Sequence, residues 1–402
     1  MNNKIALVTC YFQRNYGSQL QAFATQMIFE KLRIPNETIR IDGLLSDIKK
    51  KKYRYFIGRL FDYDTIKDKM ATVRKKIAQM LNPEYAKNLS VRYDKFEDFS
   101  KTKFHLSKYY HNKKELSSDA YHYRAFIVGS DQLWLPSNIV ADYYTLNFVP
   151  DTIPKISLST SFGVSYLSPA IAKKARTFLS RLDYLSVREL SGKQLVKQLI
   201  DRDVPVVCDP TMMFTAEEWE RTLDAKGSGF DFSDGYDYIF VYFLGNNSWQ
   251  RELVKKVKEK TNLMIVQIAH SDEYVKGDNG FADYTPYNVG PKEFVELIRD
   301  AKYVFTDSFH CTVFSLLNVK KFFTFPRYNH DGPTSTNGRL NSLLSLLHQE
   351  ERFIRKSEVD TFFSQEKLDF DISKNNVICD LEQLRQKSWD WLNFALKESK
   401  IL

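Results

Sequence analysis

The sequence is poor in cysteine, and its few cysteines are far apart. Only four of the 402 residues are cysteines, namely Cys10, Cys208, Cys311 and Cys379. No CxxC pair occurs, and no histidine stands at metal-ligand spacing from these positions. This argues against a disulfide framework and against a zinc site, so we expect a protein of the reducing cytosol that binds no metal.

Long hydrophobic runs are also missing. None approaches the ~18 residues that a helix needs to cross a bilayer. The apolar stretch near the start, residues 5–8, is short and leads into a loop and a predicted helix, with no cleavage site of small residues. It therefore predicts a first β-strand rather than a signal peptide, and we expect a cytoplasmic enzyme.

Several common functional motifs are absent. The chain contains no GxGxxG, GxxxxGK[ST], HExxH or GxSxG sequence. Their absence argues against dinucleotide-dependent dehydrogenases, P-loop enzymes, zinc proteases and α/β-hydrolases. No nucleic-acid-binding motif occurs either, so nucleic acid is not an expected partner.

The residues that are present suit a globular protein of two domains. Hydrophobic residues make up 43% of the chain and charged residues 27%, and 402 residues are ample for two domains with a core each. The net charge of +8 is unevenly distributed. Residues 47–92 contain thirteen lysines and arginines but only five acidic residues, so this segment carries the whole excess.

Strand and helix signals alternate along the chain in two blocks. The first block predicts buried strands at residues 5–9, 37–41, 125–128, 155–159, 184–187 and 204–208. A second block predicts strands at residues 238–244, 263–269, 303–306 and 321–325. Short apolar strands that alternate with helices favour parallel sheets with right-handed crossovers.

The predicted fold is therefore α/β, with two Rossmann-like, doubly wound domains that face a cleft. The stretch 226–236, rich in Gly, Ser and Asp, predicts a linker. We expect an N-terminal domain, a connecting helix and linker, a C-terminal domain, and a terminal helix that packs back across both. The expected boundaries are 1–211, 212–236, 237–380 and 381–402.

In parallel sheets, ligands bind beyond the carboxyl ends of the strands, so the loops there are the places to look for chemistry. The strongest signal is the sequence TDSFH at residues 306–310, between a predicted strand and a helix. Ser308 is a natural N-cap, and the helix start beyond it offers amides to an anion. His310 would present a titratable ring there. The simpler alternative is a capped helix with a packed histidine.

Three other loops follow predicted strands. Arg188 could clamp a phosphate or carboxylate with its planar guanidinium, or could lie on the surface beside Glu189. The sequence GSDQLW at residues 129–134 offers a carboxylate, an amide and an aromatic ring, a set suited to holding a sugar. The sequence NYGSQLQ at residues 15–21 has a single glycine and is weak evidence for a nucleotide-binding loop.

Taken in order, seven short motifs resemble those of the polysaccharide pyruvyl transferase family. They are NYGSQLQA from Asn15, VGSDQLW from Val128, STSFG from Ser159, YLSVRE from Tyr184, VVCDPT from Val206, TDSFHCTVFSL from Thr306 and GRLNSLL from Gly338. The resemblance covers nearly the whole chain. It implies a fold similar to the GT-B glycosyltransferases, and transfer of pyruvate from phosphoenolpyruvate onto two hydroxyls of a sugar, forming a ketal and releasing phosphate without a cofactor.

The resemblance also implies roles for single residues. His310 and Arg188 match positions important for the donor, and Arg339 lies in a further family motif. We assign the catalytic roles to His310, Arg188 and Asp131, with His310 as acid or assistant of phosphate departure and Asp131 on the acceptor side. Donor binding is assigned to Arg188, Ser308, His310 and Arg339, and acceptor binding to Asn15, Tyr16, Gln132 and Trp134. Cys311 stands where the family commonly has glycine, and it would narrow the donor pocket if the backbone approaches the donor there. The resemblance also places the N-terminal domain on the acceptor side and the C-terminal domain on the donor side.

Two other functions compete with this prediction. A GT-B glycosyltransferase that uses a nucleotide sugar would share the fold, but no convincing acidic residue for the ribose is evident. The second competing function is that of a non-enzymatic protein that binds nucleic acid through its basic segment. We instead expect the segment from Lys49 to Arg92 to bind an anionic membrane surface at the inner face of the cell membrane. There the enzyme would meet a lipid-linked sugar. The simpler alternative is a solvated charged face.

Overall fold

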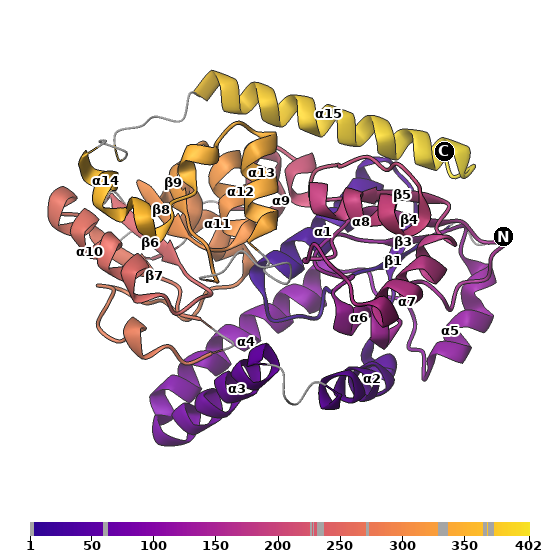
Figure 1. The fold of residues 1–402 in the computed structure, drawn as a ribbon, viewed down its shortest axis with the longest axis horizontal. Helices are drawn as coiled ribbons and strands as arrows, with labels where there is room; N and C mark the ends of the chain where they lie inside the picture. Colours follow the sequence, from indigo (N-terminus) through magenta and orange to yellow (C-terminus); the bar gives the residue numbers. More distant parts are fainter. Residues whose placement is uncertain are drawn as a thin grey trace.

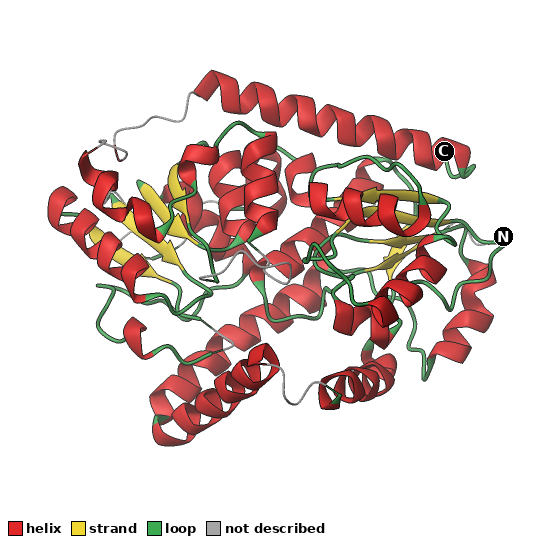
Figure 2. Ribbon diagram, viewed as in Figure 1, coloured by secondary structure: helices red, strands yellow, loops and turns green. Residues whose placement is uncertain are grey.

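The computed structural model describes residues 4–58, 63–225, 227, 229–230, 237–270, 273–328, 337–364, 368 and 374–402. Figures 1 and 2 show two separate sheets, each flanked by helices, lying side by side in the long direction of the molecule. Every strand pairing between the named strands is parallel. The predicted α/β fold of two doubly wound domains is confirmed.

The N-terminal sheet has the strand order β2-β1-β3-β4-β5. Its strands are β1 (Ile5–Val8), β2 (Asn36–Thr38), β3 (Phe126–Val128), β4 (Lys155–Thr160) and β5 (Tyr184–Val187). All residues of β1, β3 and β4 are buried, which explains why β1 and β3 are continuous apolar runs rather than alternating with polar residues. The strand order reverses between β1 and β3, and ligands bind at such a switch point.

The C-terminal sheet repeats this arrangement with the order β7-β6-β8-β9. Its strands are β6 (Tyr238–Tyr242), β7 (Met264–Gln267), β8 (Tyr303–Thr306) and β9 (Lys321–Thr324). The switch point lies between β6 and β8, so the loops after these two strands are the second expected place for a ligand.

Helices cover the sheets and form one insertion. The N-terminal half contains α1 (Tyr16–Lys31), α2 (Leu45–Ile57), α3 (Tyr63–Leu81), α4 (Pro83–Lys103), α5 (Lys113–Asp119), α6 (Pro136–Ala141), α7 (Pro169–Leu179) and α8 (Leu190–Ile200). The C-terminal half contains α9 (Ala216–Leu223), α10 (Ser248–Thr261), α11 (Pro291–Asp300), α12 (Phe309–Leu317), α13 (Gly338–Leu346), α14 (Val359–Ser364) and α15 (Lys374–Glu398). Short 3-10 helices are η1 (Asp42–Leu44), η2 (Ala120–His122), η3 (Pro210–Met213), η4 (Lys276–Asp278), η5 (Glu350–Arg352) and η6 (Lys356–Glu358).

The two domains share a hydrophobic core, because α1 is buried along most of its length between them. Tyr16, at the start of α1, stacks on Phe294 of α11 with ring centroids 4.5 Å apart. One cluster of buried apolar residues therefore runs from β1 in the first half to α13 in the second. A second, smaller cluster belongs to the C-terminal half alone.

The terminal helix α15 begins beside the C-terminal domain and ends over the N-terminal one (Figure 1). Arg385 donates to the carbonyl oxygen of Met212 at 2.9 Å, and the Ser388 hydroxyl accepts from the Cys208 amide at 2.9 Å. Because α15 begins at Lys374, the expected boundary at residue 381 falls inside this helix. Much of the expected linker, at residues 226, 228 and 231–236, lies outside the described residues.

One predicted strand does not form. Residues 204–208 make only a single parallel bridge, between Val206 and Val187. Pro205 in the middle of this segment has no N–H to donate to a ladder, which limits the pairing to its carbonyl oxygen.

The basic segment forms α2, α3 and α4 rather than one continuous surface. Arg92 on α4 is fully buried, where it donates to the carbonyl oxygens of Ala269 and Pro286 in the C-terminal domain. The expectation that the basic surface extends to Arg92 is therefore wrong, because this arginine joins the two domains. In the described part of the chain, no helix is both long enough and apolar enough to cross a membrane.

Candidate active site

A cavity of about 210 Å³ lies where the carboxyl ends of the two sheets meet. The loops at both switch points contribute to its walls, as the strand-end rule predicts. Residues that line it include Gln13, Asn15, Ser18, Asp131, Gln132, Leu244, Ser308, Phe309, His310, Arg327 and Arg339. Asn15, Asp131, Gln132, Ser308, His310 and Arg339, which the sequence indicated from four separate segments, thus meet at one cavity.

The start of α12 forms one wall. Ser308 caps the helix, since its hydroxyl accepts from the Cys311 amide at 3.5 Å. The amides of Phe309 and His310, in the first turn, can have no partner within the helix. An anion in the cavity would therefore meet amide donors and the positive end of the helix dipole.

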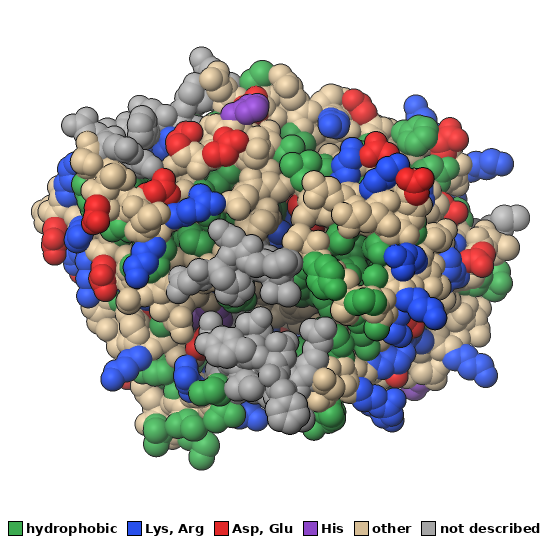
Figure 3. Space-filling model, viewed as in Figure 1, with side chains coloured by type: hydrophobic (Ala, Val, Ile, Leu, Met, Phe, Trp, Pro, Cys, Tyr) green, Lys and Arg blue, Asp and Glu red, His purple; other side chains and the backbone are tan. Residues whose placement is uncertain are grey.

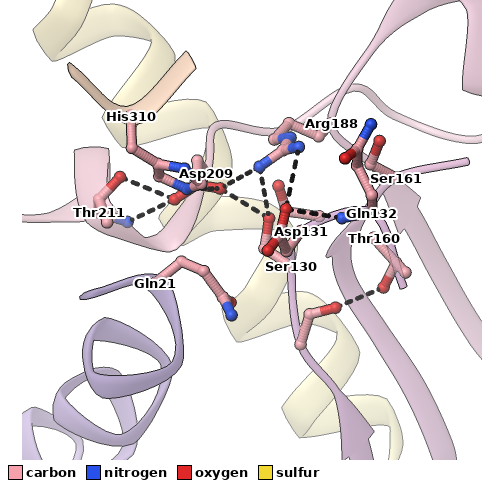
Figure 4. Close-up of polar contacts among 12 residues, drawn as sticks. Gln21, Ser130, Asp131, Gln132, Thr160, Ser161, Arg188, Asp209, Thr211 and His310 are labelled. Atoms are coloured by element: carbon pink, nitrogen blue, oxygen red, sulfur yellow. Dashed lines mark hydrogen bonds and ion pairs between the residues drawn. The ribbon is translucent and has the colours of Figure 1, made fainter. Parts of the chain in front are cut away.

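The centre of the polar network is Asp209, a residue to which we had assigned no role (Figure 4). Its Oδ2 accepts from Arg188 Nη1 at 2.6 Å and from the Ser130 hydroxyl at 2.8 Å, and lies 3.5 Å from His310 Nε2. Its Oδ1 accepts from the amide and the hydroxyl of Thr211. Asp209 thus joins side chains from four different segments.

Asp209 is ionised despite complete burial. Burial alone would raise its pKa, but the positive charges of His310 and Arg188, together with the hydrogen bonds from Thr211, lower the pKa far below its usual range. The Asp209 carboxylate, 3.5 Å from Nε2, orients the His310 imidazole. A histidine that takes part in proton transfer needs a ring held in such a fixed orientation.

Arg188 lies behind the cavity rather than on its wall. Its side chain is only 2% exposed, and its guanidinium stacks 4.1 Å from the centre of the Phe309 ring. Its Nε and Nη2 form no hydrogen bond among the described residues. Arg188 is not among the described residues that line the cavity, so its expected contact with the donor stays a prediction. The guanidinium holds Asp209 and adds positive charge next to the cavity.

Asp131 is an ionised carboxylate on the cavity wall. Its Oδ2 accepts from the Ser18 hydroxyl at 2.6 Å, and its Oδ1 accepts from the backbone N–H of Gln132 at 2.8 Å. Burial favours its neutral form, but the charges of His310 and Arg188 outweigh burial and lower the pKa. The backbone of Asp131 has a φ of +78°, which costs energy in a residue other than glycine. This backbone conformation places the carboxylate where a hydroxyl group could donate to it.

The cationic side chains of the cavity come mainly from the C-terminal domain. Burial, followed by the charges of Arg188 and Arg327, lowers the pKa of Arg339 to about 9, so Arg339 stays charged at neutral pH. With the Gln132 amide turned so that its oxygen faces Arg339, that oxygen accepts from Nε at 3.2 Å. Arg327, which sequence reasoning missed, lines the same cavity. These charges repel one another, and a bound anion would relieve the repulsion.

Two residues assigned to the acceptor do not reach the cavity. Tyr16 is buried in the domain interface, where its hydroxyl donates to the Val289 carbonyl oxygen at 3.0 Å. Trp134 is fully buried, and its Nε1 donates to the Tyr144 carbonyl oxygen at 3.1 Å. The acceptor roles of Tyr16 and Trp134 are therefore wrong. Large aromatic rings next to strand ends stabilise the fold most when they are buried in the core, and both rings are buried here.

Cys311 does not narrow the cavity. Its side chain is fully buried in the core on α12, and burial raises the pKa of its thiol to about 12. Cys311 is not among the described residues that line the cavity. Cys311 therefore does not narrow the cavity. It comes one position after His310 on α12, and successive side chains of a helix point in directions about 100° apart.

Two of the missed residues had a signal in the sequence. Asp209 follows the segment predicted as a strand at 204–208, so the strand-end rule could have selected it. Gly17 is the single glycine of its loop, and glycine often marks a close approach. A Cβ atom on Gly17 would lie 2.0 Å from Nδ1 of His310. Lys52, which also lines the cavity, had no signal because it lies within a run of four lysines.

Replacing Gly17 with alanine should lower kcat by about 10- to 100-fold, because the new methyl group must displace the His310 ring. Alanine is otherwise the better helix former by about 1 kcal/mol, so a lower activity cannot come from helix propensity. The measurement is steady-state kinetics with circular dichroism as a check of folding. Gly277→Ala is the control, since its nearest contact would be an ordinary 3.6 Å. Full activity of Gly17→Ala would show that His310 need not stay in this position.

Comparisons with known proteins agree on the fold. A sequence model of the polysaccharide pyruvyl transferase family matches residues 15–328. A UDP-N-acetylglucosamine 2-epimerase from Rickettsia bellii is similar in structure, with a TM-score of 0.55, 9% identity, and coverage of 100% of this chain and 97% of that one. A putative UDP-N-acetylglucosamine 2-epimerase from Listeria monocytogenes is also similar, with a TM-score of 0.54, 9% identity, and coverage of 94% of this chain and 91% of that one. A search of curated protein sequences gave no match. At such low identity the structural likeness shows the GT-B fold alone.

Proposed function

The chain belongs to the polysaccharide pyruvyl transferase family, and on that premise we propose that it transfers pyruvate from phosphoenolpyruvate to two hydroxyls of one sugar in a lipid-linked repeat unit. The family makes it a pyruvyltransferase of polysaccharide biosynthesis. The donor, the lipid linkage of the acceptor and the place of action are the proposed parts. The observation that carries the proposal is the cationic cavity at the two switch points.

Phosphoenolpyruvate suits the charges of this cavity. The molecule is small and carries a phosphate and a carboxylate. Lys52, Arg327 and Arg339 are the cationic side chains among the described lining residues, apart from His310, and Asp131 is the carboxylate among them. Guanidinium groups and the amides at the start of α12 are suitable partners for both anionic groups of the donor.

The chemistry assigns a task to each part of the site. Protonation of the donor methylene carbon gives an oxocarbenium-like centre, which the first sugar hydroxyl attacks. Departure of phosphate then allows the second hydroxyl to close the ketal. His310, held by Asp209, supplies the proton or assists the departing phosphate. Asp131 accepts a hydrogen bond from the attacking hydroxyl and orients it. Arg188 fixes Asp209 and balances its charge.

Phosphoenolpyruvate should raise the melting temperature by several degrees at saturating concentration, whereas uridine or guanosine diphosphate should not. The decisive measurement is phosphate release from phosphoenolpyruvate across a panel of lipid-linked and aryl β-linked sugars. We expect turnover with at least one acceptor and release of one phosphate per ketal formed. Stabilisation by a nucleoside diphosphate alone, with no phosphate release, would favour a glycosyltransferase that uses a nucleotide sugar.

We further propose that α2 and the α3–α4 hairpin contact an anionic bilayer. Lys49 and Lys50 are exposed on α2. At the tip of the hairpin, Met80 is 82% and Leu81 79% exposed. Figure 3 shows hydrophobic side chains gathered at the lower end of the molecule, where α3 and α4 lie. Exposed cations and exposed apolar side chains both suit an anionic lipid surface. Because α2 also contributes Lys52 to the cavity, such a contact would bring the site close to a lipid-linked sugar.

The protein should float with anionic liposomes at low salt and less so at high salt. Changing Lys49 and Lys50 together to Gln should weaken the partition coefficient about 30-fold, since each lysine contributes about 1 kcal/mol. The matched control changes Lys173 and Lys174, exposed on α7, to Gln, and should float like the wild type. Equal binding to neutral liposomes, or none to anionic ones, would leave these lysines as a solvated face.

A further inference from the structure

The basic helix α2 contributes one side chain to the candidate active site. Helix α2 packs against α6, and the start of α6 forms part of the cavity wall through Leu135, Ser137 and Asn138. Lys52 on α2 lines the cavity beside them. It is the one lysine or arginine that the described N-terminal domain contributes to this wall. Lys49 and Lys50, one turn or less away, are exposed instead.

Lys52 differs from Lys51 and Lys113, the other partly buried lysines of this region, in having no anionic partner among the described residues. Lys51 forms an ion pair with Asp47 at 3.3 Å, and Lys113 approaches Asp142 at 3.4 Å. Among the described residues, Lys52 has neither a hydrogen bond nor an ion pair, although its side chain is half-buried. Burial lowers the pKa of its ammonium group. A partly desolvated ammonium without a carboxylate destabilises the protein, and such groups occur where a ligand supplies the charge.

The charges on the opposite wall indicate which ligand this is. Arg327 and Arg339 line the cavity from the C-terminal domain, and Lys52 lines it from the N-terminal domain. Asp131 is the one carboxylate among the described lining residues, and Ser18 and Gln132 already donate to it. A group that meets Lys52 across from two arginines must carry more than one negative charge, as a phosphate does.

We infer that Lys52 binds a phosphate group of a substrate, so that the substrate connects the two domains through cations on both walls. This inference rests on the proposed function for the identity of the substrates. The phosphate has two possible sources, the donor and the phosphate that links the acceptor sugar to its lipid. Both present the same chemistry to an ammonium group.

The test compares Lys52→Gln with Lys173→Gln, which removes the same charge from an exposed position on α7, outside the proposed membrane contact. Kinetics should use phosphoenolpyruvate with a lipid-linked acceptor and with an uncharged aryl glycoside. Loss of one charge-assisted hydrogen bond should raise a KM about 10- to 100-fold in Lys52→Gln, and Lys173→Gln should match the wild type. A higher KM for phosphoenolpyruvate with both acceptors indicates the donor phosphate. A higher KM for the lipid-linked acceptor alone indicates the acceptor phosphate.

Two further measurements separate this role from a structural one and from failure of the proposed function. Lys52→Met should leave the melting temperature of the ligand-free protein unchanged or higher, whereas a structural lysine would give a lower one. Inorganic phosphate should bind to the wild type about 10-fold or more tightly than to Lys52→Gln in calorimetry, and this needs no turnover. Without any turnover the proposed function fails, and phosphate binding still decides on Lys52. Equal KM values and equal phosphate affinity in the wild type and Lys52→Gln would overturn the inference.

Discussion

Replacing His310 with alanine should lower kcat by about 10²- to 10⁴-fold while phosphoenolpyruvate still binds within a few-fold of its wild-type affinity. The proposed reaction needs a proton at the methylene carbon or at the departing phosphate. His310 is the histidine among the described residues that line the cavity, and the Asp209 carboxylate lies 3.5 Å from its ring. The binding cations are separate side chains, so binding and turnover should respond differently. The measurements are steady-state kinetics and calorimetry with the donor.

A matched control for this prediction is His348→Ala, which removes a histidine far from the cavity after α13. It should have wild-type kinetics. The His310→Ala protein should also keep its circular dichroism spectrum, because alanine is a good helix former and His310 lies in the first turn of α12. A folded and fully active His310→Ala protein would remove His310 from the mechanism.

Replacing Asp209 should damage both stability and catalysis. Asp209→Ala leaves Arg188 buried without its hydrogen-bonded partner, and breaking a buried ion pair in this way costs about 3–5 kcal/mol. Asp209→Asn should be milder for stability, because the amide oxygen can still accept both hydrogen bonds from Thr211, although those from Arg188 and Ser130 to the other oxygen are lost. Its kcat should still fall about 10²- to 10⁴-fold, since an amide provides no negative charge beside the His310 ring. Urea unfolding and kinetics measure the two effects separately.

The pH dependence of stability gives a second test of Asp209. Its pKa in the folded protein is depressed, so the stability that it contributes is fully present above its unfolded pKa of about 4. That contribution is lost as the pH falls from there towards the folded pKa. Asp209→Asn should therefore lose less stability than the wild type on acidification. Asp201→Asn, at an exposed carboxylate paired with Lys197, is the control. Identical acid profiles for the wild type and Asp209→Asn would contradict an ionised Asp209.

The positions of the site residues along the chain were predictable, because they depend on local rules. Asp131, Ser308 and His310 each follow an apolar segment that could only be a buried strand, and the ends of parallel strands share one edge. The same rule fails for Tyr16 and Trp134. Both follow a strand end, yet each ring turns into the core, where it buries more apolar surface than a sugar site would offer.

Roles that depend on partners could not be predicted in this way. Asp209 lies 21 residues from Arg188 and 79 from Ser130 along the chain, and no local pattern connects them. In the sequence Lys52 is one of four consecutive lysines, and only the packing of α2 on α6 distinguishes it from Lys50. Arg92 belongs to the same charged segment and is nevertheless buried between the domains.

The sequence by itself determined the fold class, the two blocks of strands and the loops that carry the chemistry. These features follow from periodicity and from the order of apolar segments, which act over a few neighbouring residues. Only the tertiary structure decided which side chains face the cavity, which ones support them, and which of four lysines enters the site. Those choices depend on burial and on ion pairs between distant segments, whose energies arise only when the two domains close around one another.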